Sequence, residues 1–470
     1  METEKTNDRY DENQSKQKRG LYISDEELQF YEGTGFFTEE EDLQDFLSVR
    51  KAQSLDNACP LNLNLMISGP SLQSGMDSVT NLIQKQTGQR LYQKSRMQLN
   101  CVLANLFCHY CQSQALWTMV PRGHETTMMK KYNPMLLNWE TVAKICDALA
   151  STGFIHMERG HTETAKGKND GHLTRIRVAA DFMDLLKQYG WRQNMLLYHP
   201  ETEPIVMKKK PAGKKTSKVI DYTNTAKSNQ TRQLLFDYHH FLRRHEILLP
   251  TAYDTAIPDL IFTRQIFSNG SWDEGGRLFG GAYQQLSKTD RQQITIDNET
   301  VIEIDISSCH ATMAFAEAGI DWFASSNQDI YQRDGLRHWP RDIIKRAFNI
   351  AINAENEKKT LSALTNTSTK DGWFLDWPDL KQPGWQNTLL NDITKAYPEL
   401  SQLLFKRRGM VYMRQEGEIG IAIIKEAMSR DIPILTLHDS FIAPRKHAAT
   451  MRVIISDAFK SVVGARCHLT

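Results

Sequence analysis

The chain has 470 residues, roughly three times a domain of about 150 residues, so we expect two or three domains with a substantial buried core. Lys and Arg number 57 and Asp and Glu 56, and the resulting formal charge of +1 indicates no particular partner. A hydrophobic content of 40% and a charged content of 24% exclude a collagen-like, mucin-like or wholly disordered chain. No apolar run approaches the length of a membrane span, and the first residues lack the apolar core of a signal peptide. The odd number of cysteines, seven, without a regular framework, indicates reduced thiols; we therefore expect a cytoplasmic protein with no membrane partner.

Residues 1–55 form an acidic segment, with clusters at Asp25–Glu27 and Glu39–Asp42. The first twenty or so residues contain too few apolar side chains to offset the entropy of folding, so we predict that they are disordered. Aromatic residues between Phe30 and Phe37 could dock short helices in the remainder.

Residues 56–200 are predicted to form a mainly helical region. The segment 98–117 repeats apolar residues at three- and four-residue spacing, which is typical of a helix with one buried face. It contains Cys108 and Cys111 around His109, but no second pair follows at a suitable spacing for zinc. Buried cysteines on a core helix are the favoured interpretation.

Within this region, residues 138–180 have the local order of a winged helix. A helix beginning at Asn138 or Thr141 and ending near Gly153 is followed by two alternating segments that predict strands, joined by a polar tip. The tip and the return strand are basic; these residues are Lys166, Lys168, His172, Arg175 and Arg177. A basic wing suits contacts with nucleic-acid phosphate, although winged helices also serve as protein-docking modules.

Residues 201–235 are interpreted as a flexible basic linker, because six lysines between Lys208 and Lys218 surround a Pro and a Gly. The lysines either keep an exposed loop soluble or lie across nucleic-acid phosphate, and the pattern does not decide between these. The linker separates the helical region from residues 236–470.

Two strands of the C-terminal region are predicted to present carboxylates. Residues 301–306 are mostly apolar and β-branched, with Asp305 near the end of the strand, and residues 432–444 predict a hairpin whose turn carries Asp439. A carboxylate beside such apolar strands is costly to bury without a cation or donor. We therefore expect Asp305 and Asp439 to hold divalent metal, for which Mg²⁺ is the natural hard cation and a two-metal pair the usual device of phosphoryl transfer.

A helix that begins at Pro340 is predicted between these strands. Arg341, Lys345, Asn349 and Asn353 follow one another at four-residue steps and so share one face of the helix. This row would suit a triphosphate, and its plainer interpretation is a solvated face. Upstream, Asp273, Gly276 and Arg277 lie in a glycine-rich turn, which is weak information by itself.

Taken in this order, the segments resemble the polymerase core of family A DNA polymerases and phage-type single-subunit RNA polymerases. Residues 273–277 resemble the DxxGR segment, and the strand with Asp305 resembles motif A. The helix with Arg341 and Lys345 resembles motif B, and residues 438–441 resemble motif C. The segment 413–428, with Gln415 and Glu418, resembles the helix that precedes motif C. The resemblance covers residues 265–450, about half of the chain.

The resemblance implies an α+β fold with a right-hand palm and fingers core, preceded by the helical region and its winged helix. It implies that Asp305 and Asp439 hold two Mg²⁺ ions, with Mn²⁺ as a substitute, and that Lys345 is also the candidate proton donor to pyrophosphate. Arg341, Lys345, Asn349 and Asn353 would bind the triphosphate, and His310 would face the sugar. Arg277, Gln415 and His438 would contact nucleic acid, together with the wing residues Lys166, Lys168 and Arg175. For Arg277 and His438 a purely structural hydrogen bond is the alternative.

The implied activity is template-directed nucleotidyl transfer without proofreading, since the first half shows no clustered exonuclease acids. The expected partners are a DNA template–primer and nucleoside triphosphates, with accessory replication proteins as possible additions. A mobile-element origin is a guess from the compact layout.

Five residues past Asp305, where family A DNA polymerases carry glutamate and the RNA polymerases glycine, this chain has His310. Its bulk favours dNTPs. The residues His-Asp-Ser-Phe of motif C are more similar to those of the RNA polymerases, so an RNA polymerase or primase remains an alternative. A non-catalytic DNA-binding replication protein is the alternative from another class.

Overall fold

The computed structural model describes residues 55, 58–69, 72–88, 93–122, 129–163, 170–192, 195–213, 216–250, 261–326, 328–370, 372–373, 377, 380 and 382–470. The chain divides into two compact units with a boundary between Thr202 and Glu203. The predicted acidic segment 1–55 lies outside the described residues except for Leu55. The mixed α+β class is confirmed.

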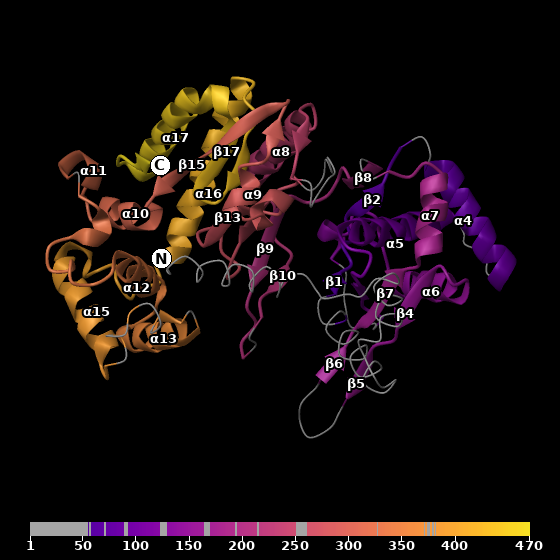
Figure 1. Cartoon of the computed structure of the whole chain (residues 1–470), viewed down its shortest axis with the longest axis horizontal. Coiled ribbons are helices and arrows are strands. Elements are labelled where there is room, and N and C mark those ends of the chain that lie inside the picture. The colour runs from indigo at the N-terminus through magenta and orange to yellow at the C-terminus, as the bar shows by residue number, and fades with distance from the viewer. Residues whose placement is uncertain are drawn as a thin grey trace, which may run out of the picture. The chain divides into compact units, whose positions relative to one another are not determined.

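The described residues of the N-terminal unit form four α-helices and several short strands. Figure 1 shows these elements in indigo to magenta. Its helices are α4 (Leu72–Thr87), α5 (Gln93–Gln112), α6 (Trp139–Ser151) and α7 (Ala180–Gln188). Its strands are β1 (Cys59–Pro60), β2 (Leu65–Ile67), β3 (Thr118–Val120), β4 (Ile155–Glu158), β5 (His161–Glu163), β6 (Asp170–His172), β7 (Thr174–Val178) and β8 (Leu196–Tyr198). Four of them form a sheet in the order β1-β3-β7-β4. As predicted, α5 is a core helix, in which Cys108 is buried and His109 Nδ1 lies 2.7 Å from the Thr118 hydroxyl.

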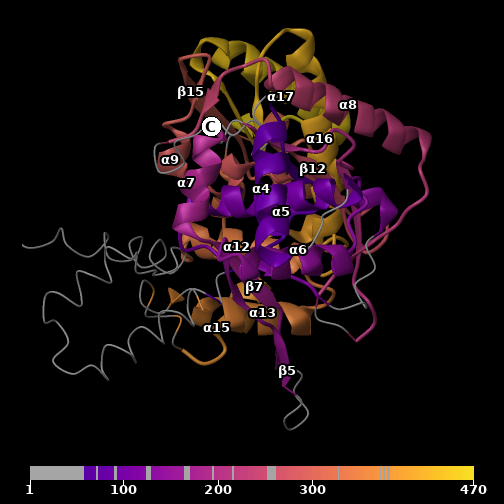
Figure 2. The same ribbon diagram turned by 90° about the vertical axis from the view of Figure 1, so that its right-hand side faces the viewer.

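The predicted helix and the two strands that follow it are present in residues 138–163 and 170–178, while residues 164–169 of the predicted tip lie outside the described residues. Asn138 caps α6 by accepting a hydrogen bond from the Thr141 amide at 2.7 Å, and Gly153 ends the helix with φ +76°. Strands β4 and β7 pair antiparallel, and β5 and β6 extend the ribbon beyond the helices of this unit (Figures 1 and 2). Val142, Ile145 and Leu149 form the buried face of α6, as their spacing predicts.

The segment 201–235 differs from the predicted linker. It contains β9 (Ile205–Lys209), β10 (Lys218–Ile220) and the start of α8 (Ala226–Leu242), all within the C-terminal unit. Strand β9 pairs parallel with β12 (Arg264–Phe267), and the side chains of Ile205, Val206 and Met207 are buried. The physical reason is the apolar run Ile-Val-Met, whose burial outweighs the solvating effect of the lysines that follow it.

The C-terminal unit contains two sheets. The first has the order β10-β9-β12-β13, where β13 spans Gly275–Phe279. The second has the order β11-β14-β15-β17-β16 with β18 beside β15. Its strands are β11 (Ile247–Leu248), β14 (Thr295–Ile296), β15 (Glu299–Ser307), β16 (Leu435–Leu437), β17 (Ser440–Pro444) and β18 (His468–Leu469).

Helices pack against these sheets and form a large common core. They are α8, α9 (Lys288–Arg291), α10 (Cys309–Glu317), α11 (Trp322–Ser325), α12 (Arg341–Asn353), α13 (Glu357–Lys370), α15 (Trp385–Ala396), α16 (Gly409–Ser429) and α17 (Ala448–Val463). Helix α16 packs on β13 and α17, while α12, α13 and α15 pack together (Figure 1). As predicted, Pro340 precedes the first residue of α12, and Ile344, Phe348 and Ile352 are buried. None of the described helices is long and apolar enough to cross a membrane.

Close contact between α16 and β13 depends on glycine. A Cβ atom at Gly417 would overlap the carbonyl oxygen of Gly276, which accepts a hydrogen bond from Gln265 Nε2 at 2.9 Å. Gly276 itself has φ +92°. Three residues further along α16, a Cβ at Gly420 would lie 3.3 Å from Leu278 Cδ1, where a small shift relieves the contact.

We predict that Gly417→Ala destabilises the protein and Gly420→Ala does not. The first substitution forces α16 away from β13 and should cost about 2–3 kcal/mol, although alanine is the better helix former in both positions. Thermal unfolding of the two variants checks this, with Gly420→Ala as the matched control. Equal melting temperatures for the two variants would contradict the contact.

Candidate active site

Asp305 lies in a strand, and Asp439 lies in the turn that precedes the neighbouring strand. Strand β15 pairs antiparallel with β17, with Asp305 opposite Ser440, and the amide of Ile306 donates to the carbonyl oxygen of Asp439 at 2.9 Å. Asp439 lies in the two-residue turn between β16 and β17, as the hairpin pattern predicts. Backbone pairing therefore fixes the separation of the two aspartates along the sheet.

A residue with a left-handed backbone occurs within three positions of each aspartate. Ser308, which follows β15, has φ +54°, and His438, which precedes Asp439, has φ +57°. A side-chain-bearing residue in this region costs of order 1–3 kcal/mol, and such residues cluster at functional sites. The two turns are thus held in conformations that the rest of the unit must stabilise.

The two aspartates line one cavity of about 310 Å³. The residues around it come from β13, β15, α10, α12, α16 and the β16–β17 turn, with Tyr331 between α11 and α12. They are Arg277, Asp305, Ile306, Ser308, Cys309, His310, Tyr331, Lys345, Asn349, Glu416 and Asp439. Residues far apart in the sequence thus meet around a strongly polar space.

The aspartates are held in an environment that opposes their ionisation. Burial raises the pKa of Asp439 to about 6, and the carboxylates of Glu416 and Asp305 act in the same direction. Burial also raises the pKa of Asp305, against the opposing charge of Lys345. Adding a cation between such groups would relieve both effects, because it compensates the charge that burial penalises.

Glu416 anchors Arg277 and His310 at the edge of the cavity. Its carboxylate, 2% exposed, pairs with the Arg277 guanidinium, with Nη2 2.8 Å from Oε1. His310 Nε2 lies 3.2 Å from Glu416 Oε2, and its ring packs edge-on against Tyr412. Burial would raise the pKa of Glu416, but His310 and Arg277 outweigh it and hold the pKa below its usual value. Glu416 is therefore an ionised, buried carboxylate.

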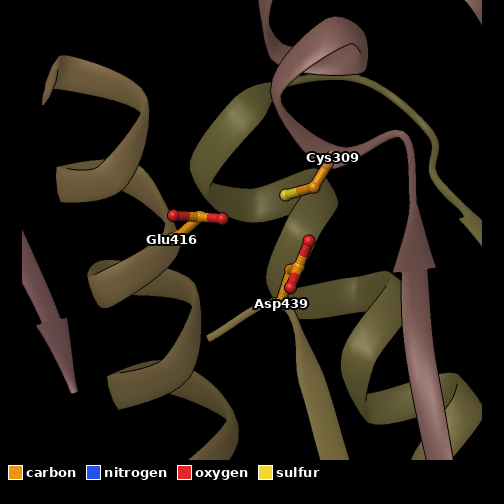
Figure 3. Close-up of side chains that lie close together, drawn as sticks. All are labelled: Cys309, Glu416 and Asp439. Carbon is orange, nitrogen blue, oxygen red and sulfur yellow. The ribbon is translucent and has the colours of Figure 1, made fainter. Parts of the chain in front are cut away.

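Cys309, Glu416 and Asp439 form a cluster whose potential ligand atoms lie within 4.8 Å of one another, and Figure 3 shows their side chains converging. Burial raises the pKa of the Cys309 thiol far above its usual value, so the thiol keeps its proton and is a poor ligand for a hard cation. Glu416 is already paired with Arg277. Of the three, Asp439 is the group best suited to Mg²⁺, with Asp305 in the same cavity.

Lys345, Asn349 and His310 line the cavity with the aspartates. Arg341, the first residue of α12, instead pairs with Asp329, and its guanidinium lies 5.4 Å from the centre of the Tyr331 ring. It is therefore next to the cavity, behind Tyr331, and a triphosphate would have to compete with Asp329 for it.

The described lining of the cavity lacks three of the predicted site residues, Asn353, Gln415 and His438. Asn353 Nδ2 donates to the Asn349 carbonyl at 2.8 Å, and its side chain fills the space beside Gly409. The ring of His438 packs edge-on against Phe279, with Nδ1 buried and no hydrogen-bond partner among the described residues. Gln415 likewise has a buried Oε1 atom lacking such a partner. His438 thus shows aromatic packing and no hydrogen bond of this ring nitrogen among the described residues, and its contact with nucleic acid, like that of Gln415, remains a prediction.

Of the predicted wing residues, Arg175 lies in β7 opposite Glu158 of β4. Lys166 and Lys168 lie outside the described residues. Their contact with nucleic acid remains a prediction.

Glu416 is the site residue that sequence reasoning missed. The available signal is its position on the buried face of α16, between Tyr412 and Ile419, where a carboxylate needs a partner. Its neighbour Gly417 marks the close approach to β13 that supplies this partner, Arg277.

No family model matches the chain, and no curated protein matches it in sequence. A solved structure of the POL domain of Pol1 from M. smegmatis, in complex with DNA primer-template and dNTP, superposes at a TM-score of 0.26 with 10% identity. The superposition covers 92% of this chain and 72% of that one. A TM-score this low does not define a common fold.

We predict that Asp439→Asn stabilises the metal-free protein at pH 7.5. The pKa of Asp439 is about 6 in the folded chain and 3.8 as an ordinary side chain, so the folded state binds the proton more tightly. The cost of ionising it is present above about pH 6 and disappears as the pH falls toward 4. At pH 7.5 the asparagine variant should gain about 2–3 kcal/mol, a rise in melting temperature of about 5 °C or more.

Thermal melts in EDTA at pH 7.5 and pH 4 check this, with Asp457→Asn on the exposed face of α17 as the control. A stabilisation that is the same at both pH values, or absent at pH 7.5, would mean that Asp439 ionises without cost.

Proposed function

We propose that this chain is a template-directed nucleotidyltransferase, a DNA-dependent DNA polymerase of the family A type without proofreading. One observation carries the proposal: Asp305, on β15, and Asp439, in the turn before the neighbouring strand β17, share a cavity with Lys345 and Arg277. Two carboxylates with cationic side chains around them are what transfer of a phosphoryl group to a hydroxyl requires. The order of the motifs in the sequence supports the same activity.

Asp305 and Asp439 would hold Mg²⁺. Their carboxylate oxygens are hard ligands, and a cation beside them would offset the burial that raises the pKa of both groups. When bound, a pair of such ions lowers the pKa of the attacking 3′-hydroxyl and neutralises charge on the leaving pyrophosphate.

Lys345 and Asn349 would bind the triphosphate from α12. Both side chains reach the cavity from one face of the helix, one turn apart, and the Lys345 charge already acts on Asp305. Lys345 is also the candidate donor of a proton to pyrophosphate. Arg341 would join them on release from Asp329.

Arg277 would position the primer end. Its guanidinium is held at the cavity edge by Glu416, so a nucleic-acid oxygen meets a donor of fixed orientation without an entropic cost at binding. The β4–β7 ribbon of the N-terminal unit, with Arg175 and the tip lysines, would contact template phosphates.

His310 would select the sugar. It lines the cavity five residues after Asp305 and is held by Glu416 and Tyr412, so its ring cannot easily move aside for a 2′-hydroxyl. This rigidity supports dNTPs as substrates.

Asp305→Asn and Asp439→Asn should each lower Mg²⁺-dependent nucleotide incorporation at least about 1,000-fold while leaving the fold intact, because each removes an oxygen charge that a metal needs. Primer extension with labelled nucleotides and circular dichroism measure the two effects. Asp457→Asn serves as the control and should keep full activity. Wild-type incorporation in either cavity variant would refute the proposal.

His310→Gly should raise the incorporation of rNTPs relative to dNTPs by about 10-fold or more, because it opens the space beside the sugar. The ratio of kcat/KM for the two nucleotides on one template–primer is the measurement. An unchanged ratio would mean that His310 does not contact the sugar, and a wild-type preference for rNTPs would favour an RNA polymerase.

A further inference from the structure

The C-terminal unit contains a second cavity, of about 440 Å³, that the proposed chemistry does not use. Helices α8 and α16, strands β9 and β12 and the turn after β12 line it, and we call it the α8–α16 pocket. Its lining includes Ile205, Phe267, Trp272, Lys227, Arg414 and Glu418. Arg414 and Glu418 lie on either side of Glu416 in α16, so this pocket and the acidic cavity lie on different faces of the same helix.

One wall of the α8–α16 pocket is aromatic. The ring of Trp272 lies 4.8 Å from that of Phe267 and 5.1 Å from that of Tyr222, both in edge-on contact. Phe267 packs with Ile205 and Met207 in an apolar cluster on the same face of the sheet. Aromatic side chains beside an apolar cavity are suited to a flat aromatic guest such as a nucleobase.

The charged side chains of the pocket favour a ligand that carries negative charge outside the aromatic part. Glu418 accepts hydrogen bonds from Lys227 at 2.5 Å and Arg414 at 2.6 Å, so two cations compensate one carboxylate. Lys425 and Asp273 complete the charged lining. The cations thus exceed the anions by one.

A pair of lysines continues the same face of the sheet away from the pocket. Ile205, Met207 and Lys209 alternate along β9 and so share one face, and Lys218 of β10 lies directly opposite Lys209. Like charges in directly opposed positions are unfavourable, so this pair is best compensated by an anion. Lys209 lies four residues beyond Ile205 in β9, a distance of about 13 Å along the strand. An extended single-stranded nucleic acid would cover this distance with about two nucleotides.

The turn that carries Trp272 also reaches the lysine pair. The Gly270 amide donates to the carbonyl oxygen of Lys208 at 2.9 Å, which ties this turn to β9. Trp272 and the two lysines therefore lie on a turn and a pair of strands that are hydrogen-bonded to one another.

We propose that the α8–α16 pocket takes one unpaired nucleobase of a single-stranded nucleic acid, while Lys209 and Lys218 contact the phosphates of adjacent nucleotides. Stacking against Trp272 would be tolerant of sequence, because every base has an aromatic face. The site goes beyond the proposed polymerase reaction and does not need catalysis to operate.

Binding of a fluorescent single strand of about 12 nucleotides to the full chain tests the proposal, by anisotropy in EDTA without nucleotide. Trp272→Leu should weaken binding about 10-fold or more, with an unchanged salt dependence, because only stacking is lost. Lys209→Gln combined with Lys218→Gln should lower the slope of log Kobs against log[salt] by about 1.4, since each phosphate contact of a single strand contributes about 0.7. Lys395→Gln combined with Lys460→Gln, two exposed lysines on α15 and α17, is the matched control and should leave the slope unchanged.

DNA and RNA strands form two arms of the experiment, and a mononucleotide forms a third. If the pocket variants bind the DNA strand or the RNA strand more weakly than the wild type does, the site is supported, and the affected strand identifies the nucleic acid that it binds. An effect on the mononucleotide alone would overturn the proposal in favour of a free-nucleotide pocket. Binding of both strands that is indifferent to the pocket variants would leave the pocket to another occupant, such as an apolar side chain of a protein partner, and would also overturn it.

A measurement on the unmodified protein avoids dependence on variant folding. A strand containing 5-iodouracil should form a photo-crosslink to Trp272 or Phe267, identified by mass spectrometry of the peptide, and crosslinks found only at other sites would contradict the placement. The same crosslink should form in Asp305→Asn. Loss of polymerase activity with retained crosslinking, or the reverse, separates failure of this site from failure of the proposed function.

Discussion

The buried ion pair between Arg277 and Glu416 is the interaction on which the candidate site depends. Removing a carboxylate from water is costly unless a cation meets it with good geometry, and the bidentate contact with Arg277 supplies this. The contact is possible because Gly417 and Gly276 let α16 approach β13 closely. The same pair shapes the field at Asp439, whose pKa Glu416 raises and Arg277 lowers. One interaction thus sets both the packing and the electrostatics of the cavity.

The aspartates illustrate the opposition between stability and chemistry. Their burial disfavours the ionised form, and two left-handed residues, Ser308 three positions after Asp305 and His438 just before Asp439, add backbone strain. The dense core of the unit, which includes Ile304, Phe441 and Ile442 from the paired strands, offsets this cost. Such an arrangement has no benefit for folding, which is why a functional role for the acids is the natural interpretation.

Local patterns predicted much of the scaffold but not its long-range contacts. The strand with Asp305, the hairpin with Asp439 and the helix after Pro340 follow from short-range periodicity, and all three are present. Strand β9 could not be predicted from the local pattern, because its apolar run is short and adjoins the lysines. The strand with which it pairs, β12, lies far along the chain. The ion pairs Arg277–Glu416 and Arg341–Asp329 likewise join residues whose proximity depends on tertiary packing. Sequence spacing therefore predicted the elements that carry Asp305 and Asp439 but not the side chains that pair with Arg277 and Arg341.

Helix α16 connects the two cavities of the C-terminal unit. Residues two apart on a helix point about 200° apart, so Glu416 faces the aspartates while Arg414 and Glu418 face the α8–α16 pocket. The central claim, template-directed nucleotidyl transfer at Asp305 and Asp439, is tested most directly by offering the wild-type protein a primer–template with one defined template base and each nucleotide separately. The account predicts Mg²⁺-dependent addition of the complementary nucleotide to the primer 3′ end. No addition, or addition that is indifferent to the template base, would contradict it.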